Sequence, residues 1–336
     1  MSLSPRRPRR LAPVEYVDGI LRRDRAVLAR AITLVESELP SDSDLASEVI
    51  ERCLPHTGRS RRVGITGVPG VGKSTFIEAL GTHLTVTLQE TVAVLSVDPS
   101  SPISGGSILG DKTRMEKLAT DDRAFIRPSP SRGHLGGVAR RTREAMLLCE
   151  AAGYRNIFIE TVGVGQSETT VRSMVDFFLL LMLAGAGDEL QGMKRGILEM
   201  TDLIAITKAD GDNRARAERA RFEYQSALHL FPAAADGWNP PVMICSAFTR
   251  EGVPDLWQRV LEHRALMDAN GWFDRRRQEQ ALLCMQDALL YALEQDVRRD
   301  ALVGDRLTAM RQDVLHGRIS PFRAARELLA LFKRRA

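Results

Sequence analysis

The chain has 336 residues, of which 44% are hydrophobic and 27% charged, and its formal net charge is +4. This composition is typical of a globular protein with one or two domains, and it excludes collagen-like and intrinsically disordered chains. The four cysteines are scattered without a C-x-x-C pair and the six histidines do not cluster, which argues against a disulfide framework and a zinc site.

Much of the excess positive charge lies in arginine runs near the two ends, at 6–10, 275–277 and 333–335. Such runs are typical of solvated tails and helix faces, and the sequence has no basic groove interleaved with aromatic residues. The longest apolar run, 177–184, is too short to cross a membrane and is typical of a buried strand. We therefore expect a cytoplasmic protein that binds neither nucleic acid nor membrane.

Residues 14–54 have the apolar spacing of helices. Leu28, Ile32 and Val35 recur with a helical period, and Asp24 precedes them at a position suited to a helix N-cap. We expect residues 1–57 to form an N-terminal helical extension.

Residues 58–270 alternate short β-rich runs with helical stretches, which predicts an α/β domain with a mostly parallel sheet covered on both faces. Most of the runs are continuously apolar, as is typical of strands buried on both sides. In sheets of this kind, ligands bind at the carboxyl ends of the strands. The expected strands are Val63–Thr66, Val92–Val97, Ala124–Arg127, Asn156–Glu160, Phe177–Leu183, Leu203–Thr207 and Val242–Cys245.

A G-x-x-x-x-G-K-[ST] motif follows the first expected strand and precedes a helical pattern. Its glycines let successive main-chain N–H groups point at phosphate oxygens, at the positive end of the following helix. Lys73 can reach the β- and γ-phosphates, and the Ser74 hydroxyl can ligate Mg²⁺. The motif predicts a P-loop NTPase whose nucleotide is bound by Gly67, Val68, Pro69, Gly70, Val71, Gly72, Lys73, Ser74 and Thr75.

Carboxylates stand at the ends of two further expected strands. Asp98 follows one, and Glu160 begins Glu160-Thr-Val-Gly163, in the place where G proteins carry D-x-x-G. There a carboxylate holds Mg²⁺ through water and the Gly163 N–H meets the γ-phosphate. We expect Ser74, Asp98 and Glu160 to form the metal environment. Asp111, in the glycine- and serine-rich loop after Asp98, either enters the active site or faces solvent.

The sequence Thr207-Lys208-Ala209-Asp210 directly follows an expected strand, as the [NT]-K-x-D motif of G proteins does. In that motif the aspartate accepts two hydrogen bonds from guanine, which adenine cannot donate. A Ser-Ala pair follows the next strand, where main-chain groups contact the guanine oxygen. Together these motifs favour GTP over ATP, with the base bound by Thr207, Lys208, Asp210, Ser246, Ala247 and Phe248.

Residues 271–336 are predicted to be helical. An apolar stripe of this kind is usually packed within its own chain, but terminal helices beyond a complete α/β domain can also form a dimerisation arm. Both interpretations are open from the residues alone. Ser320-Pro321 opens the last helix, and the stripe before it consists of Leu282, Met285, Leu289, Leu293 and Val297.

With these motifs assembled, the chain resembles the methylmalonyl-CoA mutase-associated GTPases, the MeaB/ArgK family of SIMIBI-class P-loop G proteins. The matching sequence segments are long and specific within residues 58–270, whereas the two ends of the chain resemble the family mainly in being helical. The matching segments are 64–75, 97–101, 105–115, 126–130, 135–137, 160–168 and 185–192.

This resemblance implies a GTPase that binds GTP, GDP and Mg²⁺ and acts as a chaperone for an adenosylcobalamin-dependent acyl-CoA mutase of the methylmalonyl-CoA mutase type. Members gate the loading of intact cofactor and protect or reactivate the mutase. They are typically homodimers joined by C-terminal helices, which implies a dimerisation arm over 271–336. The catalytic residues that the resemblance implies are Lys73, Asp98, Asp111, Glu160 and Lys194.

The resemblance also implies three switch segments. Asp111 lies in the first, 163–168 forms the second, and 185–195, with Gln191 and Lys194, matches the third, which couples partner binding to the nucleotide site. No glutamine directly follows Gly163, so we expect slow intrinsic hydrolysis.

The chain departs from the family pattern at two places. Thr207 stands where many members have asparagine, and threonine lacks the amide that braces the P-loop. This predicts weaker nucleotide binding, while Asp210 keeps the preference for guanine. The segment 131–134 is bulkier than the family pattern, which puts a partner surface there in doubt.

Three other classes of protein compete with this interpretation. A LAO/AO transport system kinase, a name that the family has carried, needs a phosphoacceptor pocket and adenine preference, and Asp210 argues against the latter. A nickel-insertion GTPase would carry a Cys/His cluster, which the sequence lacks. A ParA/ArsA-like ATPase would have a lysine where this chain has Val68.

Overall fold

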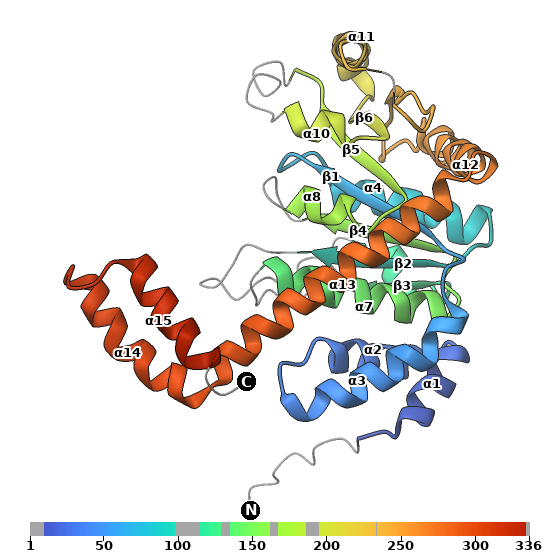
Figure 1. The fold of residues 1–336 in the computed structure, drawn as a ribbon. Coiled ribbons are helices and arrows are strands. Elements are labelled where there is room, and N and C mark those ends of the chain that lie inside the picture. The colour runs from blue at the N-terminus through green and yellow to red at the C-terminus, as the bar shows by residue number, and fades with distance from the viewer. Residues whose placement is uncertain are drawn as a thin grey trace, which may run out of the picture. The chain divides into compact units, whose positions relative to one another are not determined.

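The computed structural model describes residues 10–97, 115–128, 135–161, 167–185, 195–232 and 234–333 (Figure 1). The chain divides into two compact units, the first ending at Gln280 and the second beginning at Ala281. In the described residues, every helix is too short or too polar to cross a bilayer.

The first unit is built on a seven-stranded parallel sheet with the order β3-β2-β4-β1-β5-β6-β7. Its strands lie within two residues of the seven expected from the sequence, and the α/β fold prediction is confirmed. Because all strands run the same way, their carboxyl ends meet at one edge. The strands are β1 Arg61–Gly67, β2 Val92–Val97, β3 Ala124–Arg127, β4 Asn156–Thr161, β5 Phe177–Leu183, β6 Leu203–Thr207 and β7 Val242–Ile244.

Helices cover both faces of this sheet, as its continuously buried strands require. One face packs against α7 Leu135–Ala151, α8 Ser167–Arg172, α10 Arg195–Glu199 and α11 Arg214–Leu228. The opposite face packs against α4 Lys73–Thr82, α6 Glu116–Thr120 and α12 Val253–Ala269. Three short turns complete this unit: η1 Leu54–His56, the π-turn η2 His83–Thr87 and η3 Gly211–Asn213.

Three N-terminal helices pack on the outer side of α7: α1 Pro13–Leu21, α2 Arg25–Val35 and α3 Pro40–Cys53. The predicted cap is confirmed, since the Asp24 carboxylate accepts hydrogen bonds from the N–H groups of Ala26 and Val27. Leu28 and Ile32 are fully buried in this layer. The extension therefore shares one hydrophobic core with the sheet.

The C-terminal residues form α13 Trp272–Arg299, α14 Ala301–Leu315 and α15 Pro321–Lys333. In the second unit α14 packs against α15, burying Val303, Met310 and Ala324. As predicted, the last helix begins at Pro321, and the Ser320 hydroxyl accepts a hydrogen bond from Arg323 N–H. The apolar stripe is not packed away, however: Leu282, Met285, Leu289 and Leu293 are each 48–61% exposed.

One expectation about charge was wrong. The arginines at 275–277 were interpreted as a solvated helix face, but only Arg275 fits that description, with its side chain 64% exposed. Arg277 is 14% exposed and forms ion pairs with Asp176 and Glu150. In a helix that packs on the surface of a domain, successive residues face the solvent and the domain in turn. The run of arginines in the sequence does not show which of them face the domain.

Candidate nucleotide-binding site

The P-loop joins the end of β1 to the start of α4. Gly67 is required there because a Cβ atom would lie 2.4 Å from the carbonyl oxygen of Leu181 on the neighbouring strand. Gly72 takes a left-handed conformation, with φ at 91°, directly before α4. The buried side chains of Val68 and Val71 fix the loop to the core below. The main chain is thus curled around the N-terminus of a helix, as an anion site requires.

The Lys73 ammonium group lies over this loop. Its Nζ donates hydrogen bonds to the carbonyl oxygens of Gly67, at 2.7 Å, and Val68, at 3.4 Å. Burial lowers the pKa of Lys73, and the nearby carboxylates of Glu160 and Glu168 act against that shift. The two hydrogen bonds place the ammonium group of Lys73 where the β- and γ-phosphates of a nucleotide would lie.

Ser74 and Glu160 lie together beside Lys73. The Ser74 hydroxyl donates a 3.3 Å hydrogen bond to Oε1 of Glu160, and both residues are buried. Below them, the Thr161 hydroxyl donates a 2.8 Å hydrogen bond to Thr66 and ties the ends of β4 and β1. A hydroxyl beside a carboxylate is a donor set that suits Mg²⁺. Among the described residues, no group of three or more His, Cys, Asp or Glu side chains is placed so that it could hold a metal ion.

The two motifs assigned to the guanine base come together at the ends of β6 and β7. The Ser246 hydroxyl donates a hydrogen bond to the Asp210 carboxylate, and the Ala209 N–H donates one of 3.0 Å to the Cys245 carbonyl. Asn213 Nδ2 donates a 2.7 Å hydrogen bond to the Lys208 carbonyl and closes the turn. Asp210 is thus oriented by a partner from the adjacent strand, which the sequence did not predict.

Two residues of the same motif brace the P-loop directly. The Thr207 hydroxyl donates a 2.8 Å hydrogen bond to the carbonyl oxygen of Val71, and Lys208 Nζ donates one of 2.8 Å to the carbonyl oxygen of Gly70. Lys208 adopts φ of 56°, an unusual value for a lysine. Thr207 therefore supplies a brace of its own in place of the asparagine amide, while its effect on affinity stays a prediction.

The remaining site predictions fall into two groups. Phe248, beyond the buried Ser246, has 88% of its surface exposed. Its contact with the base therefore stays a prediction. Four predicted residues lie outside the described residues: Asp98, Asp111, Gly163 and Lys194.

Sequence reasoning gave Glu168 no role of its own, although the structure brings it to the site. It lies in the first turn of α8, is only 1% exposed, and its charge acts on Lys73. Its place at the end of the second switch segment, 163–168, was the available signal. An acidic residue in the first turn of a short helix is usually a favourable helix-dipole contact, so this signal was ambiguous.

Comparisons with known proteins agree with these features. A family model described as methylmalonyl Co-A mutase-associated GTPase MeaB matches residues 28–301. The GTPase ArgK of Escherichia coli (strain K12) is 49% identical over 268 residues, covering 80% of this chain and 81% of that protein. The mitochondrial methylmalonic aciduria type A homolog of Mus musculus is 46% identical over 327 residues, covering 94% of this chain and 79% of that protein. The crystal structure of a LAO/AO transport system kinase has a TM-score of 0.73 at 36% identity, covering 96% of this chain and 97% of that one.

Proposed function

The chain belongs to the methylmalonyl-CoA mutase-associated GTPase family, MeaB, and we propose that it uses GTP to gate adenosylcobalamin loading on a B12-dependent acyl-CoA mutase. GTP hydrolysis itself is the activity of its named relatives. The observation that carries the proposal is the match of the mutase-associated family model to 28–301, which includes the whole P-loop sheet. The likeness to the methylmalonic aciduria type A homologs also supports it.

In the proposed reaction a water molecule attacks the γ-phosphorus of GTP in line with the departing GDP oxygen. Lys73 contributes positive charge to the γ-phosphate as negative charge develops there. Mg²⁺, when bound, would neutralise the phosphate oxygens from its place near Ser74 and Glu160. Asp210 selects guanine, because its carboxylate accepts both hydrogen bonds that the base edge donates. We assign catalytic roles to Asp98, Asp111 and Lys194 as well, on the family resemblance alone.

A homodimer is part of the same proposal. Six apolar side chains of α13 in the second unit are exposed: the four of the stripe described above, and Leu283 and Leu290. A hydrophobic surface of this kind on a soluble helical unit usually marks a contact with another chain. A second copy would cover it in the manner implied for the family.

A reconstitution experiment tests the chaperone role. The purified chain is mixed with a methylmalonyl-CoA mutase lacking cofactor, and complex formation and adenosylcobalamin transfer are followed with GDP, GTP and a non-hydrolysable GTP analogue. We expect a complex and a rate of cofactor loading that depends on the nucleotide. Absence of a complex in every nucleotide state contradicts the proposal but leaves the GTPase activity untouched.

The kinase alternative rests on the name of the 36% identical structure. The same preparation distinguishes it if the γ-phosphate of GTP and of ATP is radiolabelled. We expect the label to appear as inorganic phosphate from GTP. Label transferred from ATP to a binding protein of amino-acid transport would favour the kinase.

A further inference from the structure

The segment 167–176, which begins with helix α8, leads from the carboxyl edge of the sheet back to the start of β5. It follows β4 and precedes β5, so it runs against the direction of the strands. Its Val171 side chain and the nearby Val175 press onto β1 at Gly64, where an added Cβ would lie 2.8 Å from Val171 and 3.1 Å from Val175. Because nothing larger than glycine fits there, α8 packs directly against the main chain of β1 at this point.

The two ends of α8 have different neighbours. At its start, α8 carries Glu168, which is buried and whose negative charge acts against the lowering of the pKa of Lys73 by burial. At its end, Arg172 forms an ion pair with the buried Asp202, which also accepts a 2.8 Å hydrogen bond from Phe178 N–H. The chain then turns through 173–176 into β5. This turn therefore connects the end of α8 directly to the start of β5.

Asp176 ends the turn and is 7% exposed. Its carboxylate accepts a 2.9 Å hydrogen bond from Arg62 N–H at the start of β1, and its own N–H donates one of 2.9 Å to the Arg62 carbonyl. Two hydrogen bonds thus join the turn to β1, the strand that leads to the P-loop.

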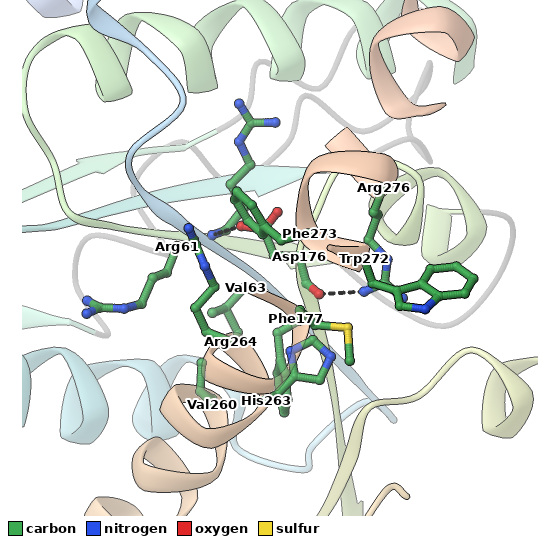
Figure 2. Close-up of a pocket in the computed structure, with 12 residues that line it drawn as sticks. Arg61, Val63, Asp176, Phe177, Val260, His263, Arg264, Trp272, Phe273 and Arg276 are labelled. Carbon is green, nitrogen blue, oxygen red and sulfur yellow. Dashed lines mark hydrogen bonds between the residues drawn. The ribbon is translucent and has the colours of Figure 1, made fainter. Parts of the chain in front are cut away.

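Three side chains from the first turns of α13 hold the turn from the other side, next to a small pocket that Figure 2 shows. Arg277 forms a two-pronged ion pair with Asp176, at 2.6 and 2.7 Å. Arg276 donates a 2.7 Å hydrogen bond to the Asp176 carbonyl, drawn as a dashed line in Figure 2. Gln280, also buried, donates one of 2.8 Å to the Val175 carbonyl.

We propose that Arg277 is a positioning residue for GTP hydrolysis, which acts through Asp176 and α8 on the placement of Glu168 beside Lys73. An arginine fork that holds both carboxylate oxygens fixes direction as well as distance, which a single charge does not. Arg277 lies near the start of α13, which ends at Arg299. On this proposal, the first turns of α13 influence the rate of GTP hydrolysis. This role lies outside the nucleotide-contacting motifs.

The test compares Arg277→Lys, Gln280→Met and Arg275→Lys in the full-length chain. Arg277→Lys keeps the charge and loses the fork, and Gln280→Met keeps the chain length and loses one hydrogen bond. Arg275→Lys is the matched control, because Arg275 is exposed and pairs with Glu279 on its own helix. For each protein, kcat for GTP is measured per GDP-binding site, counted by titration with a fluorescent GDP, together with the Kd for GDP.

We expect Arg277→Lys to lower kcat per site about fivefold, with a smaller fall for Gln280→Met and none for Arg275→Lys. The Kd for GDP stays at the parental value in all three, since the substituted side chains belong neither to the P-loop nor to the base-binding motifs. A parental kcat per site in Arg277→Lys overturns the proposal. If that variant does not fold, a parental kcat per site in Gln280→Met overturns it. If total activity falls only in proportion to the number of GDP-binding sites, so that kcat per site is unchanged, Arg277 has a structural role and the proposal is overturned as well.

Discussion

The Thr207 hydroxyl donates a 2.8 Å hydrogen bond to the carbonyl oxygen of Val71, and the Thr207 Oγ1 atom also lies 3.2 Å from the carbonyl oxygen of Met182. This pair connects the end of β6, where the guanine motif begins, with the phosphate-binding loop. This buried side chain therefore joins the base-reading and phosphate-binding halves of the site, as the exposed hydrogen bond from Lys208 to Gly70 also does. Thr207 is 3% exposed, so water does not compete for the bond.

Thr207→Val removes this hydroxyl with almost no change in shape. We expect GDP to bind about 2- to 12-fold more weakly, because one buried hydrogen bond contributes on this scale and the Val71 carbonyl loses a partner. Isothermal titration with GDP measures the effect, and Thr87→Val, at an exposed position of η2, is the control. Unchanged affinity in Thr207→Val would show that the P-loop keeps its conformation without the brace.

Asp210→Asn tests the choice of base. The amide can no longer accept both hydrogen bonds from guanine, so we expect GDP affinity to fall on the order of 100-fold or more, with preference moving to xanthosine diphosphate. Competition binding with both nucleotides measures this shift. Asp212→Asn changes an exposed carboxylate two residues away and is expected to bind GDP as the parent does. Retained preference for guanine in Asp210→Asn would contradict the assignment of the base site.

Much of the fold was predictable because its strands are short apolar runs that end in motifs. The run Leu203–Thr207 matches β6 without error, and Val63–Thr66 differs from β1 only by flanking residues. The P-loop and base-binding motifs were predictable for the same reason: they are contiguous in sequence, and a parallel sheet brings strand ends to one edge.

The parts that were not predictable depend on contacts between residues distant in sequence. Arg277 and Asp176 are 101 positions apart, and neither belongs to a motif. The hydrogen bond from Ser246 to Asp210 needs the order of β6 and β7 in the sheet, which strand positions alone do not give. The packing of the apolar stripe of α13 was left open because periodicity shows that a face is apolar but not what covers it.

Lys73→Ala removes the cation from the P-loop. We expect kcat for GTP to fall on the order of 100-fold or more, since a positive charge at the γ-phosphate acts mainly on the transition state. Single-turnover hydrolysis at saturating GTP measures this step separately from binding. Lys333→Ala, near the end of α15, controls for the loss of one positive charge. Hydrolysis at the parental rate in Lys73→Ala would exclude the phosphate role assigned to this residue.

Glu150 gives the fold a defined sensitivity to acid. Burial would raise the pKa of this carboxyl, but Arg62 and Arg277 together with the Ser60 hydroxyl hold it at about 2, below the ordinary value of 4.5. A carboxyl whose pKa is lower in the folded state stabilises the fold above the unfolded value and loses that contribution as it takes up a proton. The free energy of unfolding should therefore fall between about pH 4.5 and pH 2, and part of that fall belongs to Glu150.

Urea unfolding of the parent and of Glu150→Gln between pH 7 and pH 3 isolates this part. We expect the variant to be about 1–3 kcal/mol less stable at pH 7, because two buried arginines lose a charged partner. Its free energy of unfolding should then decline less steeply towards pH 3, so that the two curves approach each other. Glu279→Gln, an exposed carboxylate on α13, should follow the parent throughout. Parallel curves for the parent and Glu150→Gln would mean that another group carries the acid sensitivity.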